Sequence, residues 1–70
     1  MRNKLRYLRV IQHNLTQAEM AAKIGVSRTT YSRVENGTAE ASKLFLNRLQ
    51  TAFSIPDGEI WSYTKNETGG

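Results

Sequence analysis

Apolar residues recur at intervals of three and four along most of this chain, which is the spacing of amphipathic helices. Leu5, Leu8 and Ile11 predict the inner face of a first helix over about residues 3–13, with Asn14 as its left-handed end. A later helix is predicted to begin at the N-cap Ser42. Its apolar positions are Phe45, Leu46, Leu49, Ala52 and Phe53. The pattern predicts an all-α fold.

Two helix starts stand close together in the middle of the chain. Thr16 and Glu19 form a capping box, in which each side chain bonds to the other's backbone amide. This box predicts a helix over about residues 16–24, and Gly25 is suited to end it in a left-handed conformation. Ser27 is a second N-cap. Because so few residues link the two helices, they are expected to cross steeply, as in a helix-turn-helix.

The second of these helices, over about residues 27–36, divides into two faces. The buried face of the pair is predicted to comprise Met20, Ala21, Ile24, Val26, Tyr31 and Val34. Tyr31 is expected in the core with its hydroxyl near the surface. The opposite stripe, at spacings of three and four, comprises Arg28, Thr29, Ser32, Arg33 and Asn36.

This polar stripe has the chemistry of a base-reading surface. Arginine pairs with guanine O6 and N7 in the major groove, and a threonine methyl contacts thymine. Arg28, Thr29, Ser32 and Arg33 are therefore the candidate base-reading residues. The alternative is an ordinary solvated face, which any surface helix has.

The end of the chain predicts one more short element. Pro56 suits the first turn of a fifth helix that reaches about Trp61. Tyr63 and Thr64 favour a brief extended segment, so a short β segment is compatible with the pattern. We therefore expect a domain over residues 1–64 and a flexible tail over residues 65–70.

Composition is consistent with a polyanionic partner. Ten basic and six acidic residues give the 70-residue chain a net charge of +4. Ordinary solubility charge would produce the same excess. The chain has no cysteine, so disulfides and thiolate metal sites are excluded, and no metal or cofactor is expected. Without a membrane span or secretory signal, a cytoplasmic, nucleoid-associated protein of a bacterium or phage is expected.

Enzymatic chemistry finds little support. His13 is the only histidine and Asp57 the only aspartate, and nothing in the sequence brings them together. There is no glycine-rich phosphate loop and no metal-ligand spacing. The chain is therefore expected not to be an enzyme.

The residues carry a family resemblance. The strings LTQAEMA from Leu15, GVSR from Gly25 and SRVENG from Ser32 resemble the Cro/repressor type of helix-turn-helix regulators, also called the xenobiotic-response-element family. The resemblance extends more loosely from about Leu5 to Trp61. It implies a compact five-helix, lambda-repressor-like domain, DNA binding by the third helix and a homodimer.

Phosphate contacts are expected around the base-reading stripe. Gln17 lies at a helix start, where amides can hold a phosphate, and the matching glutamine of the family contacts the DNA backbone. Ser27 and Lys43 are further candidates, and Lys43 is the only cation in a loop that is usually basic in the family. Asn36 and the backbone amides of Gly37 and Thr38 form another candidate clamp. Their alternative role is to cap the helix, and both roles can hold at once.

Glu35 is expected to face away from DNA, because phosphates repel a carboxylate. The resemblance implies that it pairs with an arginine of the first helix, for which Arg9 is the candidate. The usual Leu-Arg pair of the family lies one residue closer to the turn than Leu8 and Arg9 do here.

The expected function is sequence-specific binding of double-stranded DNA by a transcriptional regulator. A repressor homodimer on an inverted repeat, acting by occlusion, is the preferred interpretation. Ile60, Trp61 and Tyr63 are the candidate dimer contacts, since terminal aromatic clusters are enriched at interfaces. Trp61 could instead close the monomer core. The competing function is an antitoxin or other interaction module that binds a partner protein.

Overall fold

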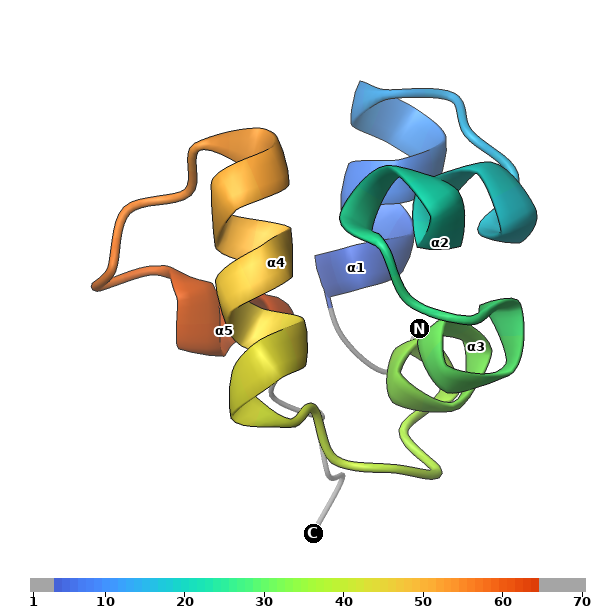
Figure 1. Ribbon diagram of the computed structural model, residues 1–70. Helices are drawn as coiled ribbons and strands as arrows, with labels where there is room; N and C mark the ends of the chain where they lie inside the picture. The colour runs from blue at the N-terminus through green and yellow to red at the C-terminus, as the bar shows by residue number, and fades with distance from the viewer. Residues whose placement is uncertain (1–3, 65–70) are drawn as a thin grey trace, which may run out of the picture.

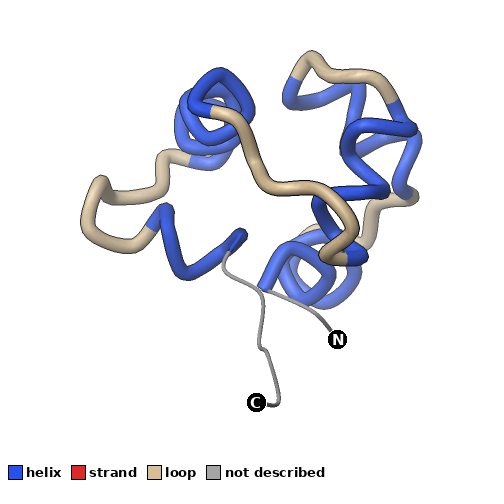
Figure 2. Tube along the Cα trace, turned by 90° about the horizontal axis from the view of Figure 1, so that it is seen from below, coloured by secondary structure: helices blue, strands red, loops and turns tan. Residues whose placement is uncertain are grey.

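Five α-helices and one π-helical segment form the computed structural model, which describes residues 4–64. In chain order they are α1 (Lys4–Arg6), the π-helix η1 (Tyr7–Gln12), α2 (Gln17–Ile24), α3 (Arg28–Asn36), α4 (Lys43–Phe53) and α5 (Ile60–Thr64). Figure 2 shows only helix and loop in this described part of the chain. The all-α prediction is confirmed.

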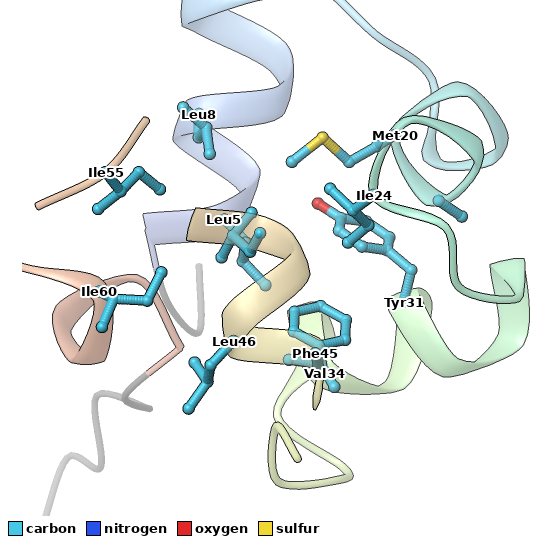
Figure 3. Close-up of a cluster of buried hydrophobic side chains, with 12 residues drawn as sticks. Leu5, Leu8, Met20, Ile24, Tyr31, Val34, Phe45, Leu46, Ile55 and Ile60 are labelled. Carbon is cyan, nitrogen blue, oxygen red and sulfur yellow. The ribbon is translucent and has the colours of Figure 1, made fainter. Parts of the chain in front are cut away.

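The helices surround one apolar core. In Figure 1, α4 and α5 lie on one side and the α2–α3 pair on the other, with α1 and η1 between them. Twelve apolar side chains are buried where these helices meet (Figure 3): Leu5, Leu8, Met20, Ala21, Ile24, Tyr31, Val34, Phe45, Leu46, Leu49, Ile55 and Ile60. The rings of Tyr31 and Phe45 stack with their centroids 6.2 Å apart, which joins α3 to α4.

The helix-turn-helix forms as the local signals predict. Thr16 Oγ1 accepts from the Glu19 amide at 3.1 Å, and the Thr16 amide donates to Glu19 Oε1 at 2.9 Å. Gly25 ends α2 with φ of 79°, a left-handed conformation that glycine adopts without steric penalty. Ser27 then caps α3. The capping box, the turn and both helix starts are therefore confirmed.

The first helix differs from the prediction in its geometry. Asn14 is left-handed with φ of 51°, as expected, but residues 7–12 form a π-helix. A π-helix closes its hydrogen bonds over five residues and has more residues per turn than an α-helix. Residues three apart, such as Leu8 and Ile11, therefore share a face less closely than they would in an α-helix. Leu5 and Leu8 are buried, whereas Ile11 is 65% exposed. The prediction that Ile11 belongs to the core was wrong for this reason.

The C-terminal prediction also requires correction. Pro56 lies before the fifth helix rather than in its first turn. Its carbonyl accepts from the amides of Glu59 and Ile60, and residues 57–59 form a turn. The helix begins only at Ile60. Tyr63 and Thr64, expected to be extended, are its last residues. The core gains Ile55, which periodicity did not single out.

The predicted tail over residues 65–70 and the predicted helix start at residue 3 lie outside the described residues. Within residues 4–64, none of the helices has the length and apolar character needed to cross a membrane. The same residues contain no group of three or more acidic or histidine side chains placed to hold a metal ion.

Candidate nucleic-acid interface

The polar stripe lies on the solvent-facing side of α3. Arg28, Thr29, Arg33 and Asn36 are exposed, and Ser32 is half-buried. Within residues 4–64, neither the Arg28 nor the Arg33 guanidinium is held by a hydrogen bond or an ion pair. An exposed arginine without an intramolecular partner keeps all five donors available. The structure thus brings the four candidate base-reading side chains together on one face.

The start of α3 uses its hydroxyl groups for capping. Ser27 Oγ accepts from the Thr30 amide at 3.1 Å and donates to Thr30 Oγ1 at 2.8 Å. The hydroxyl proton of Ser27 is therefore already used within the helix. Thr30, which is exposed and was not singled out from the sequence, accepts this hydrogen bond and keeps its own hydroxyl proton for another acceptor. The sequence signal for this contact was the position of Thr30, three residues after the N-cap serine Ser27.

The end of α3 is capped in a similar way. The amide and the Oγ1 hydroxyl of Thr38 both donate to the Arg33 carbonyl, at 2.9 and 3.2 Å. Asn36 Nδ2 donates to Ser32 Oγ at 3.4 Å and has a second N–H for an external acceptor. The Gly37 amide donates to the Val34 carbonyl at 3.2 Å. The capping role of this segment is therefore realised, the prediction that the Gly37 and Thr38 amides hold a phosphate was wrong, and Asn36 keeps a donor for one.

Behind the stripe, a buried carboxylate joins three helical segments. Glu35 of α3 accepts from Arg9 of η1 through Nε at 2.9 Å and Nη2 at 3.0 Å. Tyr31 donates its hydroxyl proton to Glu35 Oε2 at 2.5 Å, and Gln17 Nε2 at the start of α2 donates to Oε1 at 3.3 Å. Arg9 also donates to the Leu15 carbonyl at 2.9 Å. We call Arg9, Gln17, Tyr31 and Glu35 the Glu35 cluster.

The Glu35 cluster confirms one expectation and corrects another. Arg9 is the partner of Glu35, as the resemblance implied. The extra residue between this pair and the turn is accommodated by the π-helical turn, which holds one more residue per hydrogen-bonded ring than an α-helix. Tyr31 is fully buried, as predicted, but its hydroxyl lies inside the cluster rather than near the surface.

Burial and hydrogen bonding act against each other on these groups. Burial of Glu35 disfavours its charged form, but hydrogen bonds from Arg9, Tyr31 and Gln17 outweigh burial and hold its pKa below the usual value. Burial, and then the hydrogen bond to Glu35, raises the pKa of Tyr31. Glu35 is thus an anion and Tyr31 a neutral donor at neutral pH.

Two cations lie near the helix-turn-helix in addition to the predicted Lys43, which is exposed at the start of α4. The Arg48 guanidinium lies against Gly25, so that a Cβ added at Gly25 would be 2.5 Å from Arg48 Nη1. Lys23 Nζ lies 5.5 Å from the centre of the Phe53 ring. Arg48 was not singled out from the sequence, because only the packing of α4 against α2 brings it to the turn.

The three candidate dimer contacts have different environments. Ile60 is buried in the monomer core, whereas the adjacent Trp61 is 66% exposed. Tyr63 is half-buried, packs against the core and has Lys4 Nζ 5.6 Å from its ring centre. Trp61 therefore does not close the monomer core. It is the member of the three that offers a large apolar surface to another molecule.

Comparison with known proteins agrees with this geometry. A helix-turn-helix family model matches residues 5–60. An uncharacterised HTH-type transcriptional regulator of Methanocaldococcus jannaschii is 37% identical over 67 residues, which cover 96% of this chain and all of the relative. Control protein C.MunI of a Mycoplasma species is 35% identical over 65 residues, covering 93% of this chain and 88% of that protein. No solved structure gives a significant match.

Proposed function

The chain belongs to the helix-turn-helix family of DNA-binding transcriptional regulators rather than to an enzyme family, and from this premise we propose that it recognises a specific operator as a homodimer. The observation that carries the proposal is the pair of exposed, unpaired guanidinium groups, Arg28 and Arg33, on α3. In a helix-turn-helix the second helix enters the major groove. Both arginines can then donate two hydrogen bonds to a guanine, while Thr29 and Ser32 contact neighbouring bases.

Phosphate contacts would fix the position of α3 on the duplex. Gln17 at the start of α2, Asn36 at the end of α3 and Lys43 at the start of α4 each have a donor available. Ser27 would contribute through its backbone amide, because its hydroxyl proton is used in capping. Thr38 is not retained as a phosphate contact, because both its amide and its hydroxyl donate to the Arg33 carbonyl. With few cations in this set, the salt dependence of binding would be shallow, since each neutralised phosphate adds slightly less than one unit of slope.

The dimer we propose forms through Trp61. This residue is one of five large apolar side chains exposed in the described part of the chain: Tyr7, Val10, Ile11, Leu44 and Trp61. Two-fold symmetry would place the two recognition helices about one DNA turn, or about 34 Å, apart on an inverted repeat. If the protein were a monomer at high micromolar concentration, the exposed tryptophan would instead favour an interaction module with a partner protein.

Repression by occlusion is the simplest mode of action for this dimer. Residues 4–64 form the helices and their connections, with no second core in this range that could act as a sensor. Binding over a promoter would exclude polymerase, and association with DNA would hold the protein at the nucleoid.

The test is fluorescence anisotropy with two labelled duplexes at one salt concentration, one selected by the protein and one unrelated. Sequence-specific binding predicts an affinity at least about a thousandfold higher for the selected duplex. Equal affinities would contradict the proposal.

A further inference from the structure

We infer that Glu35, which cannot itself approach DNA, is a positioning residue for the phosphate contact of Gln17. This inference rests on the proposed function, since it assumes that Gln17 contacts the DNA backbone. It goes further by assigning the orientation of that contact to a carboxylate on a different helix.

The geometry of the Gln17 amide supports the assignment. Its Nε2 carries two hydrogens, and one of them is directed at Glu35 Oε1 over 3.3 Å. A carboxylate only accepts hydrogen bonds, so it selects the amide rotamer in which the NH₂ group, rather than the carbonyl, faces the cluster. The second N–H then remains for an acceptor outside the protein. A phosphate oxygen is such an acceptor, and the half-buried side chain restricts where it can lie.

The carboxylate is itself held in place from other directions. Arg9 approaches through two nitrogens at 2.9 and 3.0 Å, and Tyr31 occupies Oε2. The Glu35 side chain is only 4% exposed. A group fixed in this way can orient a weaker partner, because it does not move to follow that partner.

The assignment also links the two functions of the interface. Glu35 belongs to α3, the helix with the base-reading stripe, whereas Gln17 begins α2. The hydrogen bond between them fixes where the phosphate donor lies relative to Arg28 and Arg33. A duplex can then form the base contacts of α3 and the phosphate contact of Gln17 without rearrangement of these side chains. Such preorganisation lowers the entropic cost of binding.

A double-mutant cycle on DNA affinity tests the inference. Gln17→Ala is expected to weaken operator binding about tenfold, the usual effect of one hydrogen bond to a charged group. Glu35→Gln should weaken it at least about threefold in the wild-type background, and by a clearly smaller factor in the Gln17→Ala background. A long-range charge effect of Glu35→Gln would be equal in both backgrounds, and so equal factors would overturn the inference.

Tyr31→Phe is the matched control, because it removes a donor from Oε2 and leaves the Gln17 partner atom, Oε1, untouched. Its coupling to Gln17→Ala should be clearly weaker than that of Glu35→Gln, because Arg9 still holds the carboxylate through two nitrogens. Coupling of Tyr31→Phe to Gln17 as strong as that of Glu35→Gln would overturn the specific role of Oε1.

A measurement on the wild-type protein avoids variants that fail to fold. The ¹⁵N order parameter of the Gln17 side-chain amide should approach that of rigid backbone, about 0.85. A freely mobile amide would overturn the inference. A Gln17→Ala variant with unchanged affinity for the operator would also overturn it. The proposed function would still stand in that case if the wild-type protein preferred its operator over unrelated DNA in the same titrations.

Discussion

Arg9 and Glu35, 26 positions apart in the chain, form a two-nitrogen ion pair between η1 and α3, with N–O distances of 2.9 and 3.0 Å. Both side chains are largely removed from solvent, at 13% and 4% exposure. The pair ties η1 to α3, and its hydrogen bonds reach α2 through Gln17.

Removal of one member of this pair should destabilise the fold strongly. Arg9→Ala leaves the buried Glu35 carboxylate without its cation, which typically costs about 3–5 kcal/mol. Urea denaturation should show this loss, whereas Arg48→Ala, an exposed arginine outside the cluster, should change stability by less than about 0.5 kcal/mol. Equal effects of the two substitutions would contradict a structural role for the pair.

Stability should also depend on pH through Glu35. Its pKa is lower in the folded protein than the usual value of 4.5, so its contribution is complete above that value and is lost as the pH falls through the folded pKa. Urea midpoints measured from pH 7 down to pH 3 should fall more steeply for the wild type than for Glu35→Gln. Glu40→Gln, on an exposed loop, should behave as the wild type does. Parallel profiles for wild type and Glu35→Gln would exclude this contribution.

Gly25→Ala should destabilise the protein because of the backbone conformation rather than the clash. The φ of 79° costs a residue with a Cβ about 1–2 kcal/mol. Arg48 Nη1, the atom in the way, is the end of a flexible side chain and can move. Thermal denaturation should therefore give the same loss with Arg48→Ala added.

Gly58→Ala is the matched control for that substitution. No atom lies within 4 Å of the Cβ position there, and its φ is not in the left-handed region. It should leave stability unchanged or raise it by about 0.4–1 kcal/mol through the unfolded state. A loss at Gly58 as large as that at Gly25 would contradict the explanation from φ.

Trp61→Ala should abolish self-association while leaving the monomer folded, since the side chain is 66% exposed. Sedimentation velocity over a range of concentrations should show a dimer for the wild type and a monomer for the variant. Ile60→Ala should instead lower the free energy of unfolding by about 2–5 kcal/mol, because it leaves a cavity in the core. A wild-type monomer at high micromolar concentration would rule out the dimer.

Local signals predicted the helix-turn-helix well. The Thr16 capping box, the Ser27 cap and the left-handed Gly25 each depend on residues within a few positions of one another. The exposure of the α3 stripe follows from the helical period alone. These features therefore need little information from the rest of the fold.

Features that depend on distant packing were missed or left open. The π-helical turn at residues 7–12 moves Ile11 out of the core, and the same segment places Arg9 against Glu35, which lies 26 positions away in the chain. Ile60 and Trp61 are adjacent, yet one is buried and the other exposed, because tertiary contacts orient the short helix α5. Periodicity over so few residues carries no signal for that choice.

Arg28→Ala and Arg33→Ala should each weaken operator binding by about 1–3 kcal/mol and relax the preference at one base pair. Lys23→Ala, a cation outside the proposed interface, is the control and should keep the full base preference. Anisotropy titrations with base-substituted duplexes check this prediction. Unchanged discrimination between duplexes in both variants would show that Arg28 and Arg33 do not read bases.

The decisive experiment for DNA recognition by α3 is the selection of bound fragments from random duplex DNA by the purified protein. We expect enrichment of an inverted repeat with half-sites about one helical turn apart. Each half-site should contain guanines, and Arg28→Ala and Arg33→Ala should each lose the preference for guanine at a different position. Failure to enrich any sequence, or an identical motif for the wild type and both variants, would contradict it.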